Sequence, residues 1–216
     1  MRIFSSLNRL LNAPDDIVAP AGDSPAFAPA ASLLCGAVLC YVAYAVAAGS
    51  FQGGSGVLLA MLKVPLIILA SVLLCLPSLY VFATLGGATF TKQSFMTAVA
   101  AFCAIAGLIL LALMPITWLF SVSSTSLGFV VSIHVFVWLT AIAFGHRILT
   151  RSAPEARAAI GLWLTLLLLV SLQMTTYLRP VLWRPAGGDL FELEKKSFFM
   201  HIRQLDTKTP PLEAKR

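Results

Sequence analysis

Two ionisable side chains inside the long apolar stretches of this chain could do chemistry, Lys63 and His134. A lysine within a membrane can contact a substrate or an ion, and a histidine can carry a proton or bind a metal. His134 has no second histidine or acid at a matching depth, so we favour a structural hydrogen bond to a neighbouring helix. Lys63 stands near the edge of its apolar run, where its amine can reach the interface. A substrate or ion site is the alternative for both residues.

The other patterns that could indicate catalysis are incomplete. Gly53-Gly54-Ser55-Gly56 places a serine among glycines, but no base accompanies it, so we expect a flexible turn. Gly86-Gly87-Ala88 lacks the Lys-Ser/Thr pair that follows in a phosphate-binding loop. The 4 cysteines lie in apolar runs and form no CxxC pair. We therefore expect no catalytic residue, cofactor or metal ion, and a protein that is not an enzyme.

The elements that hold these residues are strongly apolar. Hydrophobic residues make up 59% of the chain and charged residues 11%, which is typical of a polytopic membrane protein rather than a soluble domain. Glu155 is the only acid between Pro29 and Leu178, so a carboxylate relay for protons has no carrier there. The net charge of +6 does not indicate nucleic-acid binding, because the basic residues stand beside the ends of apolar runs or in the C-terminal tail.

The apolar runs predict an all-α fold, a transmembrane bundle of about five helices. We expect a leader at 1–28, a transmembrane domain at 29–178 and a polar tail at 179–216. The expected spans are 30–49, 64–85, 95–120, 127–146 and 158–178. Lys63 and Pro65 are expected to break the second run, so that 57–62 forms a separate interfacial segment, and Pro77 is expected to kink the span that follows.

The first twelve residues predict an amphipathic helix. Its apolar face contains Ile3, Phe4, Leu7, Leu10 and Leu11. The opposite face carries Arg2 and Arg9, which suits a helix in the membrane interface near anionic lipid. The alternative is a helix packed on the protein's own surface. In the C-terminal tail, the spacing of Asp189 and Glu192 predicts a short helix, whose Phe198 and Phe199 return to the interface or dock on the bundle.

Small residues predict where spans meet. The first span carries a stripe formed by Ser32, Gly36, Cys40, Ala43 and Ala47. The third span carries Cys103 and Gly107 four residues apart. Small residues at these spacings allow helix backbones to approach closely, so we expect both faces to pack against other spans.

Basic residues predict the orientation. Arg2 and Arg9 at the N-terminus, Lys92 in the second loop, and Arg147, Arg151 and Arg157 in the fourth loop place these parts in the cytoplasm by the positive-inside rule. We expect a multi-pass protein of a cell inner membrane. Five spans then put the basic tail outside; a four-span chain with one re-entrant segment is the alternative. The candidate contacts for lipid or a protein partner are Arg2, Arg9, His146, Arg147, Arg151, Arg179, Arg184, Phe198 and Phe199.

Two stretches of the chain resemble bacterial Yip1-like membrane proteins. The stretch from Leu7 to Asp16 resembles their amphipathic start, which ends in a proline followed by charged or polar residues. The stretch from Leu85 to Phe95 resembles their second connection, where a Gly-Gly turn and a Phe-Thr-Lys-Gln run lead into the third span. The five-span layout is the third match. The resemblance covers 1–178 and implies a cytoplasmic N-terminus, a C-terminus on the far side and a role as an adaptor that binds proteins and organises membrane.

The tail departs from that family's pattern. Residues 173–180, together with Phe191 and 194–199, look like the end of other bacterial integral membrane proteins. The expected function is a non-enzymatic adaptor or scaffold in the lipid bilayer, whose partner is another membrane protein or a second copy of the chain, and not nucleic acid. A small transporter or channel component is the alternative. Its pathway would be lined by Lys63, His134, Pro65, Pro77 and Pro115.

Overall fold

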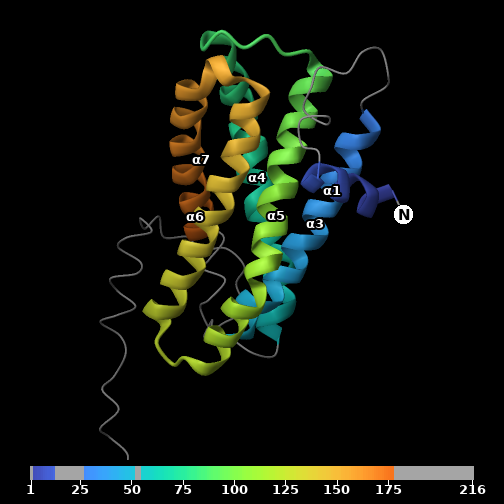
Figure 1. Cartoon of the computed structure of the whole chain (residues 1–216). Coiled ribbons are helices and arrows are strands. Elements are labelled where there is room, and N and C mark those ends of the chain that lie inside the picture. Colours follow the sequence, from blue (N-terminus) through green and yellow to red (C-terminus); the bar gives the residue numbers. More distant parts are fainter. Residues whose placement is uncertain (1, 13–26, 52–54, 178–216) are drawn as a thin grey trace, which may run out of the picture.

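Figure 1 shows the computed structural model of the chain, which describes residues 2–12, 27–51 and 55–177. Every regular element in these ranges is a helix, so the predicted all-α fold is confirmed. The elements are α1 (Arg2–Asn12), α3 (Phe27–Ser50), α4 (Ser55–Leu85), α5 (Lys92–Ser123), α6 (Leu127–Ser152), the short 3-10 helix η1 (Pro154–Ala156) and α7 (Arg157–Tyr177). Five stretches, of 21, 30, 32, 25 and 22 residues on α3 to α7, are long and apolar enough to cross a membrane.

The five long helices form a ring in the order α3, α5, α6, α7 and α4, in which each helix packs against two neighbours. Figure 1 shows α3 and α5 on one side of the ring, α6 and α7 on the other, and α4 behind them. The contact between α3 and α5 is the most extensive in the ring, and the contact between α6 and α7 is the least extensive. The short α1 lies outside the ring, across α3, and also touches α5.

The second apolar run forms one continuous helix, α4, which includes Lys63 and contains both Pro65 and Pro77. The expected break before Pro65 and the separate segment at 57–62 are therefore wrong. Each proline removes one intrahelical hydrogen bond. Breaking the helix would leave several backbone groups without hydrogen-bond partners in an apolar environment. This costs more free energy than the one hydrogen bond that each proline removes.

The ends of the helices follow local sequence signals. Gly87 has a φ of +94°, and Ala88 donates its N–H to the carbonyl of Ala83, which is the pattern of a Schellman motif after α4. Thr91 caps α5 by accepting a hydrogen bond from the backbone N–H of Ser94 at 3.1 Å. The fourth span is longer than the expected 127–146, because α6 continues to Ser152. Arg147 and Arg151 therefore lie on a helix and not in a loop.

Small residues allow α3 and α5 to approach closely at Gly107. A side-chain carbon added to Gly107 of α5 would lie 3.1 Å from the Cβ atom of Cys40 on α3. The predicted packing of these two small-residue faces is confirmed at this point. Two residues at the start of the same stripe, Ser32 and Gly36, instead face α1.

The centre of the ring is filled by side chains. Trp163 of α7 is completely buried, and its ring meets that of Phe102 on α5 edge to face, with 5.9 Å between the centroids. The indole N–H of Trp163 donates to the carbonyl of Cys75 on α4 at 2.8 Å, and the hydroxyl of Tyr41 donates to the carbonyl of Cys103 at 2.7 Å. A cavity of about 20 Å³ is left between the five helices, which is room for about one water molecule.

Candidate functional site

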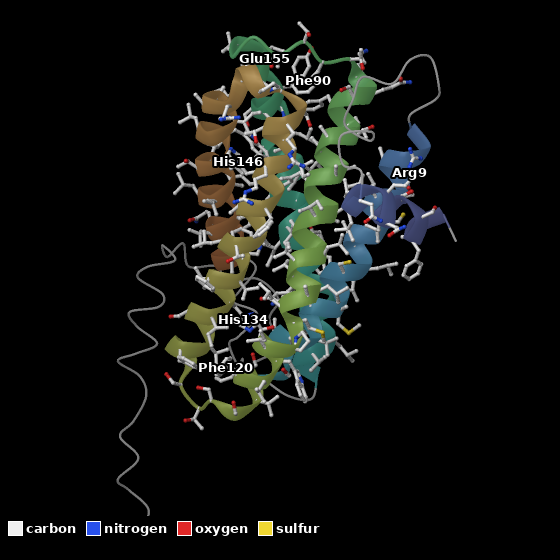
Figure 2. All side chains as sticks on the ribbon, viewed as in Figure 1. Arg9, Phe90, Phe120, His134, His146 and Glu155 are labelled. Carbon is white, nitrogen blue, oxygen red and sulfur yellow. The ribbon has the colours of Figure 1, made fainter. Side chains whose placement is uncertain are left out.

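His134 lies in a polar cluster that joins three helices. The hydroxyl of Tyr44 on α3 lies 2.6 Å from Nδ1 of His134, and the hydroxyl of Ser121 on α5 lies 3.1 Å from Nε2. Tyr44 and Ser121 are 4% and 3% exposed. We call these three residues the His134 cluster. Figure 2 shows His134 near Phe120, at the end of the bundle where α5 ends and α6 begins, which we call the His134 end.

One assignment of donors and acceptors satisfies all the hydrogen bonds of the His134 cluster. In the tautomer that uses every polar hydrogen, the hydroxyl of Ser121 donates to the carbonyl of Thr117 at 2.7 Å and its oxygen accepts from the Nε2–H of His134. Nδ1 of the neutral imidazole then accepts a hydrogen bond from the hydroxyl of Tyr44. Every polar hydrogen of the cluster is used. A neutral cluster with satisfied hydrogen bonds is what burial inside a membrane requires.

A serine next to a histidine nitrogen is also the starting geometry of nucleophilic catalysis. In this tautomer His134 presents an N–H to Ser121, so it cannot accept the serine proton. Ser121 is buried, and neither residue lines the cavity at the centre of the ring. The geometry therefore favours a link between α3, α5 and α6. The structural role expected for His134 stays a prediction, now with named hydrogen-bond partners.

Lys63 lies about two turns inside α4, because this helix already begins at Ser55. Its side chain is partly buried. His134 belongs to α6, which is not a neighbour of α4 in the ring. The central cavity is lined by mostly apolar side chains from all five long helices. These do not include any of the residues expected to line a transport pathway, namely Lys63, His134, Pro65, Pro77 and Pro115.

The helix α1 rests on the ring through one half of its apolar face. Leu10 is 1% exposed, and it packs among apolar residues of α3 and α5. A side-chain carbon added to Gly36 of α3 would lie 3.1 Å from Cδ1 of Leu7, so the two helices are in close contact. The hydroxyl groups of Ser6 and Ser32 are 2.7 Å apart and form a hydrogen bond. The contact between α1 and α3 is thus both apolar and polar.

The other half of the apolar face of α1 is open. Phe4 is 81% exposed and Leu11 is 59% exposed. Arg9 is also exposed, and Figure 2 shows it beside α3 on the outside of the bundle. The helix packs on the protein's own surface, and its position in the membrane interface stays a prediction. It leaves Phe4 and Leu11 available to lipid or to a partner.

The opposite end of the bundle carries exposed positive charge. Its exposed basic residues are Lys92, Arg147, Arg151 and Arg157. Glu155, also exposed, lies in η1 between α6 and α7, and Figure 2 shows it at this end. We call this end the basic end. It contains Arg147 and Arg151, which the sequence singled out as lipid or partner contacts.

His146 differs from its basic neighbours. Its Nε2 atom is shielded from the surface and has no hydrogen-bond partner among the described residues. That atom is therefore out of reach of a lipid headgroup or a partner. The side chain of Arg2 and all of Arg179, Arg184, Phe198 and Phe199 lie outside the described residues, as does the predicted tail helix.

Four residues that the sequence did not single out hold the helices together through polar groups. They are Tyr41, Tyr44, Ser121 and Trp163. A phenol or an indole N–H deep in an apolar run needs a hydrogen-bond partner, and this requirement could have pointed to the two tyrosines and the tryptophan. Serine is common in apolar helices and bonds to its own backbone, so Ser121 carries no such signal.

The five apolar helices, joined by hydrogen bonds such as those of Tyr44 and Trp163, define a multi-pass integral membrane protein. Comparison with protein-family models, curated proteins and solved structures finds no match for this chain. The resemblance to Yip1-like proteins therefore has no support from these comparisons. The cytoplasmic N-terminus stays a prediction from the charge pattern, and placement in an inner membrane stays a prediction as well.

Proposed function

We propose that this chain is a non-enzymatic, membrane-embedded adaptor or scaffold that acts through protein partners or lipid. The observation that carries the proposal is the position of α1. This helix is held against α3 by Leu7, Leu10 and Ser6, while Phe4 and Leu11 remain exposed. A helix that is already held in place binds a partner without the entropic cost of ordering it.

The exposed pair on α1 differs from an ordinary lipid-facing surface. A surface helix of a membrane bundle is normally apolar all round its lipid side, as α4 is with Leu62, Leu66 and Leu73. On α1, Phe4 and Leu11 form a narrow apolar strip beside the exposed Arg9 and Asn8. A strip of aromatic and aliphatic side chains bordered by polar groups is typical of an interaction surface.

The test is affinity purification of the full chain in mild detergent, followed by mass spectrometry of the bound proteins. We expect Phe4→Ala/Leu11→Ala to lose the partners that the natural chain retains. The matched control is Leu162→Ala/Leu169→Ala, which removes two exposed apolar side chains, seven residues apart like Phe4 and Leu11, from α7, a helix that does not neighbour α3 in the ring. Equal capture by all three chains would contradict the proposal.

A flux assay in liposomes tests the transporter alternative directly. We expect no substrate-dependent flux with the natural chain. Flux that is abolished by His134→Ala would overturn the adaptor proposal, since that substitution removes the imidazole at the centre of the His134 cluster.

A further inference from the structure

One face of α6 is exposed along much of its length. Phe136, Leu139 and Phe144 on this face are 69%, 45% and 42% exposed. These apolar side chains face the acyl chains of the bilayer. The same face continues, three and seven residues after Phe144, into the exposed Arg147 and Arg151. A lipid whose chains lie along this face therefore has its headgroup near these two arginines.

The length of α6 places the arginines at the right depth. The candidate span Gly128–Ser152 has 25 residues, which gives a helix of about 38 Å against a hydrocarbon core of about 30 Å. The difference of about 8 Å is less than one and a half helical turns, so Arg151, one residue before the end of the span, reaches the headgroup region. Arg147 lies one turn deeper, where its long side chain can extend toward the headgroups. The guanidinium of Arg147 lies over the ring of Phe144, with 5.1 Å between Cζ and the ring centroid. This cation–π contact holds the charge beside an exposed apolar ring, at the boundary between chains and headgroups.

We propose that the outward face of α6 at the basic end binds an anionic phospholipid, with the guanidinium groups of Arg147 and Arg151 on its phosphate. Side chains four residues apart on a helix start about 5–6 Å from each other, so two guanidinium groups can reach one phosphate. Guanidinium groups bind phosphate oxygens in pairs of parallel hydrogen bonds. This proposal names the class of lipid through which the adaptor of the proposed function acts, and it rests on that proposed function.

The surrounding charges favour an anion. Arg157 at the start of α7 adds a third exposed guanidinium at this end, whereas the exposed Glu155 opposes it. The Nε2 atom of the neighbouring His146 is shielded, so the exposed arginines carry the proposed contact. An acidic segment of a partner protein would meet the same charges. The lipid is favoured because the arginines continue a face that is otherwise made of Phe136, Leu139 and Phe144.

The test uses the purified full chain in neutral detergent. Basic residues also set the orientation of a membrane protein in the cell, and this effect is absent in detergent. Native mass spectrometry measures the binding of phosphatidylglycerol and of phosphatidylcholine with the same acyl chains. We expect the natural chain to prefer phosphatidylglycerol. Arg147→Gln/Arg151→Gln should reduce this preference by between about tenfold and thirtyfold. Glu155→Gln should increase it.

Lys92→Gln is the matched control, since it removes one exposed charge at the same end but on α5. We expect it to change the preference less than about twofold. An equal loss with Lys92→Gln, or an unchanged preference in the double variant, would overturn the lipid site. If the double variant does not fold, Arg151→Gln alone carries the test, and an unchanged preference again overturns it.

Two competitors test whether a lipid is the ligand of the site at Arg147 and Arg151. Displacement of phosphatidylglycerol by inorganic phosphate or by a glutamate-rich peptide at equal concentration would overturn the lipid as the ligand. Partner capture by the Arg147→Gln/Arg151→Gln variant separates this inference from the adaptor proposal. If the variant keeps its partners and loses its lipid preference, the lipid site and the adaptor proposal are both supported. If the variant loses partners and keeps its lipid preference, the lipid site is overturned and the adaptor proposal stands.

Discussion

The two ends of the bundle differ in how their polar groups are placed. At the His134 end, the partly buried imidazole of His134 forms hydrogen bonds with the buried side chains of Tyr44 on α3 and Ser121 on α5. At the basic end, the guanidinium groups of Arg147, Arg151 and Arg157 are exposed. Buried polar groups contribute to folding once they are paired, whereas exposed charges contribute little to folding and remain available for binding.

The comparison suggests a division of roles. The first turns of α3, where Ser32 and Gly36 contact α1, belong to the same half of the bundle as the basic end. The exposed strip of α1 and the two arginines of the proposed lipid site, Arg147 and Arg151, are therefore in one half of the molecule. The His134 end contains the hydrogen bonds of the His134 cluster. We expect substitutions at the His134 end to change stability and substitutions on the two surfaces to change binding.

The largest effect is expected for Gly49→Ala at the His134 end. An added carbon would lie 2.7 Å from the Cα atom of Val57, which belongs to the backbone of α4 and cannot move alone. We expect a loss of about 3 kcal/mol in the free energy of unfolding, measured by denaturant titration in detergent. Gly128→Ala is the control, because nothing lies within 4 Å of its added carbon. A similar loss in both variants would contradict the prediction.

The next effect is expected for His134→Ala. It removes two hydrogen bonds between helices and leaves a space, so we expect a loss of about 2 kcal/mol in the free energy of unfolding. A double-mutant cycle with Tyr44→Phe should give a coupling free energy of about 1 kcal/mol. His146→Ala, on the same helix, should cost less because the Nε2 atom of His146 has no partner among the described residues. Equal losses for the two histidines would remove the contrast between the ends.

A smaller effect is expected for Gly87→Ala, at the basic end. Gly87 has a φ of +94°, which an alanine adopts at a cost of about 1 kcal/mol, although nothing lies within 4 Å of an added carbon. Thermal unfolding in detergent measures the loss. Gly161→Ala on α7 has equally open surroundings and an ordinary φ, so it should not destabilise the protein. Destabilisation by Gly161→Ala as well would show that the cost at Gly87 does not come from its φ.

The smallest effect on stability is expected for Arg147→Gln/Arg151→Gln. Both side chains are exposed, so the free energy of unfolding should change by less than about 0.5 kcal/mol. The same variant should lose its preference for anionic lipid. A destabilisation as large as that of His134→Ala would mean that the basic end also holds the fold together. That result would contradict the division of roles, in which the His134 end stabilises the fold and the basic end binds lipid.

Local properties of the sequence determined the class of this protein. The length of an apolar run decides whether it can cross a membrane, and this length is visible without knowing the neighbours of the run. The amphipathic pattern of α1 and the turn at Gly87 are local in the same sense. The prediction was wrong for α4, because a proline such as Pro65 signals a local preference that tertiary packing and the need for backbone hydrogen bonds override.

Only the tertiary structure decided which groups meet. Tyr44 and His134 are 90 residues apart in the chain, and Trp163 is 88 residues from the carbonyl of Cys75 that it binds. Pairs at such separations depend on the order of helices around the ring, which no single span specifies. The same holds for α1, where docking on α3 buries Leu10 and leaves Phe4 exposed although both belong to one apolar face. Hydropathy is a property of one segment, whereas burial and pairing are properties of several segments packed together.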